Sequence, residues 1–268
     1  MKIGTTIRNM GKASTAEIMV GCALAAQSKN IESIWVTDHI AIPPDDAEGS
    51  GGRYLETLTT LAWLAGATTS INLGSGVLIV PYRAKLLTAK QVATIQELSG
   101  GRLLLGVGVG WMDAEFRALG VDRHARGKIT DETIEFINAC FAADEVSANG
   151  QTFIFKPRPP KPPILIGGAA PHALRRAAKL ADGWMPMTRE PKQLEQPIAD
   201  YRKMTQALGK PDGNVTVMSA LPLSDEVAAR EMLSAYRELG IDRLVCAIRY
   251  EDVNSYSAEL DKLLNCTS

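Results

Sequence analysis

The chain has 268 residues, of which 46% are hydrophobic and 22% are charged, a composition typical of a globular protein. Its 29 Lys and Arg residues nearly balance its 30 Asp and Glu residues, and a net charge of −1 offers no basic excess for binding nucleic acid. The apolar runs are too short to cross a bilayer, and the first ten residues lack the apolar region of a signal peptide. We therefore expect a cytoplasmic protein with neither a nucleic-acid nor a membrane partner.

Short apolar strands alternate with helical stretches along the chain. The expected strands are 2–7, 33–37, 71–79, 102–108, 164–168, 183–187, 214–221 and 243–249. The expected helices are 15–30, 54–69, 86–99, 111–119, 131–142, 171–181, 192–209, 224–240 and 255–264. The strands are nearly continuous apolar runs, which is typical of parallel strands buried on both faces.

Two segments interrupt this alternation without ending it. Residues 145–155 predict a β-hairpin that turns at Asn149 and Gly150. The proline-rich tract 156–163 has the composition of a linker, but the strand 164–168 follows it directly.

Eight strand–helix units in about 250 residues suit a (β/α)₈ barrel. A doubly wound open sheet uses similar units, so the periodicity alone does not exclude it. Loop insertions after the second and fourth strands lie where barrels place their active-site loops, and they favour the barrel. We predict a single α/β domain over residues 1–268, a (β/α)₈ TIM barrel.

Glycine-rich turns end two of the predicted strands. The stretch SGGRLLLGVGVGW (99–111) departs from the dinucleotide pattern G-x-G-x-x-G, and no Walker motif follows it. The turn at 166–169 repeats the arrangement, and the third strand adds glycines at 74 and 76. Free backbone N–H groups at such turns favour an anion. These stretches indicate an extended ligand that bears phosphate; close packing of strands against helices is the alternative.

The pair Asp38 and His39 follows the second strand. An imidazole at the mouth of a barrel can hydrogen-bond a ligand or transfer a proton near neutral pH, although a loop histidine without function fits equally well. The other histidines, His124 and His172, are isolated, and the four cysteines have no metal-binding spacing. We expect no metal site.

Five stretches, in order, resemble the luciferase-like monooxygenase superfamily, and within it most closely the branch of probable F420-dependent oxidoreductases. They are IESIWVTDHIAIP (31–43), INLGSGVLIVPYR (71–83), LTAKQVATIQELSGGRLLLGVGVGWMDAEFRALG (87–120), PPILIGG (162–168) and LRRAAKLADGWMP (174–186). The resemblance implies a barrel of the bacterial luciferase-like type that binds a flavin or a 5-deazaflavin at its carboxyl-terminal mouth. It also implies a homodimer, for which the apolar helix 54–69 is the candidate contact.

The resemblance implies roles for particular residues. Asp38 and His39 would lie beside the reactive face of the cofactor ring as catalytic residues, and a cis peptide bond between Gly76 and Val77 would support the ring. Tyr82, Arg83 and Lys85 either meet an anionic cofactor tail or belong to a solvated loop. The implied cofactor-binding set is Asp38, His39, Ser75, Gly76, Val77, Gly108, Val109, Gly110, Trp111, Gly167, Gly168 and Ala169.

One position departs from the family pattern. Members that oxidise a sugar phosphate carry a glutamate where this chain has Trp111, and an indole cannot donate a catalytic proton. His39 is therefore the best acid or base candidate, ahead of Asp113 and Glu115 on the following helix. The leading hypothesis is a coenzyme F420-dependent oxidoreductase that transfers hydride to or from a small organic substrate. The alternatives are an FMN-dependent monooxygenase that uses O₂ and a non-catalytic flavin-binding barrel.

Overall fold

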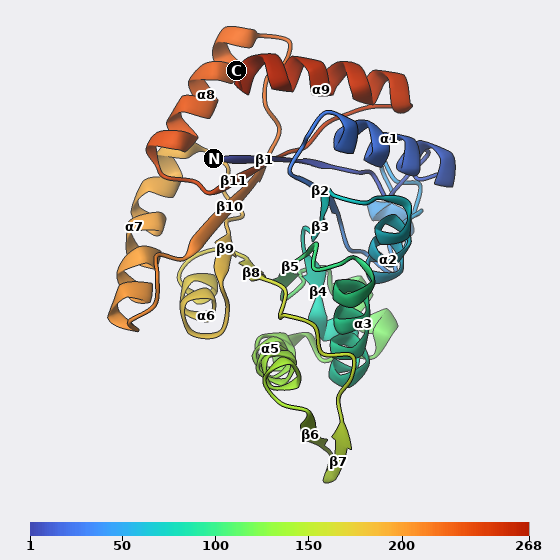
Figure 1. The fold of residues 1–268 in the computed structure, drawn as a ribbon, viewed down its shortest axis with the longest axis vertical. Coiled ribbons are helices and arrows are strands. Elements are labelled where there is room, and N and C mark those ends of the chain that lie inside the picture. Colours follow the sequence, from blue (N-terminus) through green and yellow to red (C-terminus); the bar gives the residue numbers. More distant parts are fainter. Residues whose placement is uncertain (268) are drawn as a thin grey trace.

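The computed structural model describes residues 1–267, and its centre is a closed sheet of parallel strands (Figure 1). In chain order the barrel strands are β1 (Lys2–Thr6), β2 (Ser33–Val36), β3 (Asn72–Ser75), β4 (Leu78–Ile79), β5 (Leu103–Gly108), β8 (Ile164–Gly167), β9 (Gly183–Met185), β10 (Asn214–Ser219) and β11 (Arg243–Cys246). Both β3 and β4 pair with β5, so they form one barrel strand interrupted at Gly76 and Val77. The pairing of β1 with β11 and of β3 with β5 closes the sheet, which confirms the predicted (β/α)₈ barrel.

Helices surround the barrel (Figure 1). They are α1 (Ala16–Ser28), α2 (Thr57–Ala67), α3 (Lys85–Leu98), α5 (Arg126–Ala142), α6 (His172–Leu180), α7 (Pro191–Ala207), α8 (Glu226–Glu238) and α9 (Val253–Thr267). Short 3₁₀ segments lie at Pro44–Asp46, Val80–Tyr82 and Arg123–Ala125. Within residues 1–267, no helix is long and apolar enough to cross a membrane.

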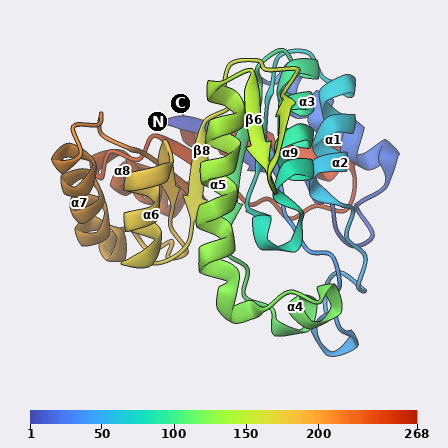
Figure 2. The same ribbon diagram turned by 90° about the horizontal axis from the view of Figure 1, so that it is seen from below.

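An additional helix, α4 (Asp113–Leu119), extends from one end of the molecule beside the loop that follows β2 (Figure 2). It begins two residues later than predicted, so Trp111 lies in the turn before it rather than inside it. The next helix, α5, begins at Arg126, five residues before the predicted start, and it absorbs part of the expected polar loop.

The predicted hairpin is present as β6 (Glu145–Ala148) and β7 (Gln151–Ile154), which pair in the antiparallel sense. Both residues of its turn have positive φ angles, 50° at Asn149 and 78° at Gly150, as a type I′ turn requires. The proline-rich tract returns the chain to the barrel, where the Pro163 carbonyl accepts a hydrogen bond from the Leu105 amide.

Large side chains fill the interior of the barrel. Trp35, Leu165, Met185 and Val245 are all buried there. A Cβ at Gly74 would lie 2.2 Å from the Trp35 indole, so glycine is required at this position to admit the ring. The other predicted glycine stretches lie further along the strands, at the end where the site forms.

Candidate active site

A cavity of about 400 Å³ lies at the carboxyl-terminal mouth of the barrel. This volume is within the range typical of sites for small molecules and cofactors. Every residue of the implied cofactor-binding set lines it except Ser75. Ser75 is fully buried, and its hydroxyl donates to the Gly106 carbonyl at 2.7 Å, so this side chain lies behind the cavity wall.

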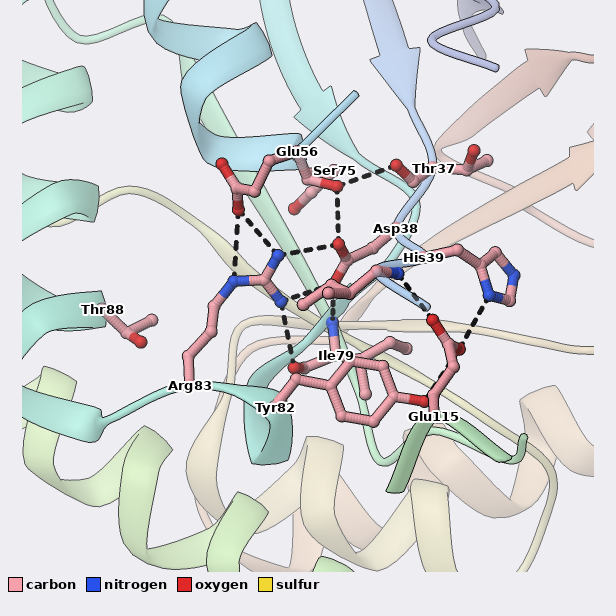
Figure 3. Close-up of polar contacts among 12 residues, drawn as sticks. Thr37, Asp38, His39, Glu56, Ser75, Ile79, Tyr82, Arg83, Thr88 and Glu115 are labelled. Carbon is pink, nitrogen blue, oxygen red and sulfur yellow. Dashed lines mark hydrogen bonds and ion pairs between the residues drawn. The ribbon is translucent and has the colours of Figure 1, made fainter. Parts of the chain in front are cut away.

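His39 faces the cavity and is held from behind by Glu115 of α4 (Figure 3). Its Nδ1 lies 2.9 Å from Oε2 of Glu115, which also accepts the Tyr82 hydroxyl at 3.0 Å. The other carboxylate oxygen, Oε1, accepts the backbone amides of Ile40 and Ala41 at 2.6 and 3.0 Å. Glu115 therefore ties α4 to the loop after β2.

These contacts fix the protonation of the pair. Burial alone would raise the pKa of Glu115, but the hydrogen bonds from His39 and the two amides outweigh it and lower that pKa to about 2. A carboxylate only accepts hydrogen bonds, so the Nδ1 of His39 carries a proton and donates it. The Nε2 atom takes no partner within residues 1–267, which leaves it available to a ligand.

Asp38 has a different environment from its neighbour (Figure 3). Arg83 donates to both carboxylate oxygens of Asp38, at 2.7 and 2.8 Å, and also to Glu56 at 2.7 Å. The Thr57 hydroxyl and the Ile79 amide complete the shell at 2.8 and 2.7 Å. Asp38 thus anchors the end of β4, and Arg83, at 10% side-chain exposure, does not extend to a cofactor tail.

The glycines of β5 are required because other parts of the protein pack closely against them. A Cβ at Gly106 would lie 2.1 Å from the Ser75 carbonyl oxygen, and one at Gly108 would lie 2.5 Å from Val77. A Cβ at Gly167 would also contact Val77, at 2.8 Å. At these positions the structure supports the packing alternative: the Val77 side chain fits between two strand ends because neither carries a side chain.

The backbone at these turns still suits a ligand. Gly110 has a φ of 75° and Gly168 a φ of 145°, conformations that favour glycine. Within residues 1–267, the amides of 109–111 and of 169–170 donate to no protein acceptor. Two runs of unpaired N–H groups therefore border the cavity, and the second run precedes the nine-residue helix α6.

Three features of the site were missed or misplaced in the sequence. Glu115, expected as a separate acid or base, is instead the partner of His39. Arg83, expected at a cofactor tail or in a solvated loop, is buried against Asp38. Arg189 and three methionines, Met185, Met187 and Met218, also line the cavity and were not singled out. Met185, Met187 and Arg189 occupy alternate positions at the end of β9 and in the loop after it, and this alternation is the local signal that could have found them; only Met218 lies elsewhere in the sequence.

A family model described as luciferase-like monooxygenase matches residues 1–262. The chain belongs to the luciferase-like monooxygenase family. Members of this family are oxidoreductases, which confirms the expectation of an enzyme of that class. The uncharacterized protein Rv0940c of Mycobacterium tuberculosis is 34% identical over 206 residues, covering 70% of this chain and 71% of that protein. A second protein of that organism, Rv0953c, is 26% identical over 263 residues, 90% of each chain.

Solved structures share the fold at low sequence identity. The monooxygenase RslO1 from Streptomyces bottropensis has a TM-score of 0.83 at 18% identity, covering 100% of both chains. An F420-dependent secondary alcohol dehydrogenase in complex with an F420-acetone adduct has a TM-score of 0.81 at 14% identity, covering 100% of this chain and 99% of that chain. The coenzyme F420-dependent tetrahydromethanopterin reductase from Methanopyrus kandleri has a TM-score of 0.72 at 14% identity, covering 99% of each.

Proposed function

We propose that this protein is a coenzyme F420-dependent oxidoreductase that transfers hydride between the deazaflavin C5 and a small organic substrate. The observation that carries the proposal is His39, whose Nε2 faces the cavity while a buried carboxylate holds its Nδ1. The F420-dependent dehydrogenase and reductase that share the fold over nearly their whole length support the choice of cofactor.

The cavity has the surfaces that such a cofactor needs. Val77 and the neighbouring strand ends form an apolar wall, and Met185 and Met218 add flexible apolar contacts, which suit a flat ring system. The unpaired amides at 109–111 and 169–170 offer donors for an anionic side chain. When bound, the deazaflavin supplies the hydride donor or acceptor.

His39 supplies or takes the proton that accompanies hydride transfer. Its Nδ1 proton is committed to Glu115, so exchange with a substrate takes place at Nε2. Because Glu115 is ionised, it stabilises the imidazolium whenever Nε2 is protonated. Asp38 does not exchange a proton with the substrate. It holds Ile79 and Arg83 in place, and we assign it a positioning role.

FMN chemistry with O₂ is the alternative activity, and the structural match to the monooxygenase RslO1 favours it. Parallel titrations with F420 and FMN, followed by fluorescence, separate the two. Tight F420 binding with weak FMN binding supports the proposal, whereas the reverse order, with O₂ consumption on reduced FMN, overturns it.

A matched pair of variants tests where the cofactor binds. Ala169 is exposed at the turn before α6, so both Ala169→Glu and Ala169→Gln leave the core intact. We expect the glutamate to weaken F420 binding at least tenfold by repelling the anionic tail, and the glutamine to weaken it less than threefold. Equal effects of the two variants would contradict an anion at this turn.

Substitution of His39 tests the proton step. With a substrate found by screening ketones and aldehydes against reduced F420, His39→Ala should lower turnover by about 10²–10⁴-fold while F420 binding is retained. Unchanged turnover would remove His39 from the mechanism.

We also propose that the protein forms a homodimer through α2. Most apolar side chains of this helix are buried in the core, including Leu58, Leu61 and Leu64, but Trp63 remains 40% exposed. Light scattering of the protein and of Trp63→Glu at micromolar concentration tests this. A monomeric wild type would exclude the dimer.

A further inference from the structure

Two large apolar side chains border the cavity without being covered by protein. Trp111, in the turn after β5, is 62% exposed, and Met187, in the loop after β9, is 64% exposed. Single exposed apolar residues are common, but two that line the same cavity offer area for an apolar ligand to bury.

Trp111 lies beside His39, the candidate proton donor or acceptor. Its ring centroid is 6.2 Å from that of His39, and the two planes are nearly perpendicular at 84°. Tyr54 flanks the same imidazole, with centroids 4.9 Å apart. Trp111 and His39 both line the cavity, so a molecule that reaches His39 from the cavity lies beside an exposed indole, and such a ring binds flat apolar groups well.

The charges around this position disfavour an anion. Glu115 has no Lys or Arg partner within residues 1–267, so a negative charge lies directly behind His39 whenever the imidazole is neutral. Asp38 shares its Arg83 partner with Glu56, so one cation faces two carboxylates there. Arg189 is the one Lys or Arg among the residues that line the cavity, and it is exposed in the loop after β9.

From these observations we infer that Trp111 and Met187 recognise the substrate, and that the substrate is an uncharged molecule with a flat apolar ring. This moves Trp111 from the cofactor-binding set implied by the family resemblance to the substrate side. The inference rests on the proposed function, because His39 is taken to mark the position of the reacting atom.

Calorimetric titration of the cofactor-loaded protein with three probes tests the inference. The probes are 2-acetylnaphthalene, which is flat and neutral; 2-naphthoate, which is flat and anionic; and cyclohexyl methyl ketone, which is neutral and not flat. We expect 2-acetylnaphthalene to bind most tightly. Trp111→Ala should raise its Kd at least fivefold, and Met187→Ala should raise it about twofold. Leu98→Ala, which removes an exposed apolar side chain that does not line the cavity, should leave it unchanged.

Fluorescence titration with F420 or FMN, whichever binds, supplies the second readout. The inference requires that Trp111→Ala change the Kd of the cofactor less than twofold. It is overturned if Trp111→Ala weakens the cofactor instead of the probe, or if 2-acetylnaphthalene does not bind. Tighter binding of 2-naphthoate, lost in Arg189→Gln, also overturns it. If neither cofactor binds, the proposed function fails. If 2-acetylnaphthalene still binds to the apo protein and Trp111→Ala weakens it, the assignment of Trp111 to ligand recognition is retained.

Discussion

Asp38 and His39 are adjacent in the chain, yet their surroundings differ in one decisive respect. The Asp38 carboxylate is enclosed, with Arg83, Thr57 and the Ile79 amide satisfying both oxygens. His39 is held at one nitrogen by Glu115 and has no partner at the other within the described chain.

The difference separates a group that maintains the site from a group able to act in it. Hydrogen bonds that fill every position of a buried carboxylate leave nothing for a ligand, and removing one of them exposes an unpaired charge. A ring nitrogen without a partner beside a cavity costs little stability and can exchange a proton. We therefore expect stability to depend mainly on the Asp38 cluster and turnover mainly on His39.

The largest stability effect is expected for Arg83→Met. The methionine leaves the buried Asp38 carboxylate without its bidentate partner, which typically costs about 3–5 kcal/mol. Urea unfolding followed by circular dichroism measures the change. Arg230→Met is the matched control, because it breaks only exposed contacts, an ion pair with Glu226 and a hydrogen bond to the Asn265 carbonyl, and should cost less than about 1 kcal/mol. Similar losses in the two variants would contradict the contrast between Asp38 and His39.

The fold was largely predictable, for physical reasons visible in individual segments. The eight strands were found because both faces of a barrel strand are buried, so runs such as 102–108 are almost wholly apolar. The hairpin was found because Asn149 and Gly150 tolerate positive φ. The start of α5 was missed, because its first turn is polar and lacks a capping side chain.

The site was only partly predictable. His39 and the glycine turns were found because they follow strands and match a family pattern. Glu115 was a candidate acid or base, but its pairing gave no signal, since its partners Ile40, Ala41 and Tyr82 lie more than thirty positions away. The glycines at 106 and 108 suggested room for a ligand, whereas Ser75 and Val77 occupy that space. A glycine in a sequence does not indicate which neighbour approaches it.

The contribution of Glu115 to folding stability should depend on pH. Its pKa is about 2 in the folded protein and near the ordinary 4.5 when unfolded, so the unfolded chain binds the proton first as pH falls. Its contribution to stability is therefore complete above about pH 4.5 and is lost toward pH 2. Between pH 6 and pH 3, the wild type should lose about 2 kcal/mol more unfolding free energy than Glu115→Gln, which cannot titrate. Urea titrations at both pH values measure this, and equal losses would show that Glu115 is not held ionised.

The smallest effect is expected at Tyr82, whose hydroxyl donates to the same carboxylate oxygen as His39, at 3.0 Å. Tyr82→Phe removes that bond and keeps the ring packed edge-on against Phe116, so it should cost about 1–2 kcal/mol. Tyr54→Phe is the control: its ring also contacts His39, but its hydroxyl makes no hydrogen bond within residues 1–267, and the loss should stay below about 0.5 kcal/mol. A loss of the same size in Tyr54→Phe would mean that ring packing, rather than the hydrogen bond to the carboxylate, accounts for the change in stability.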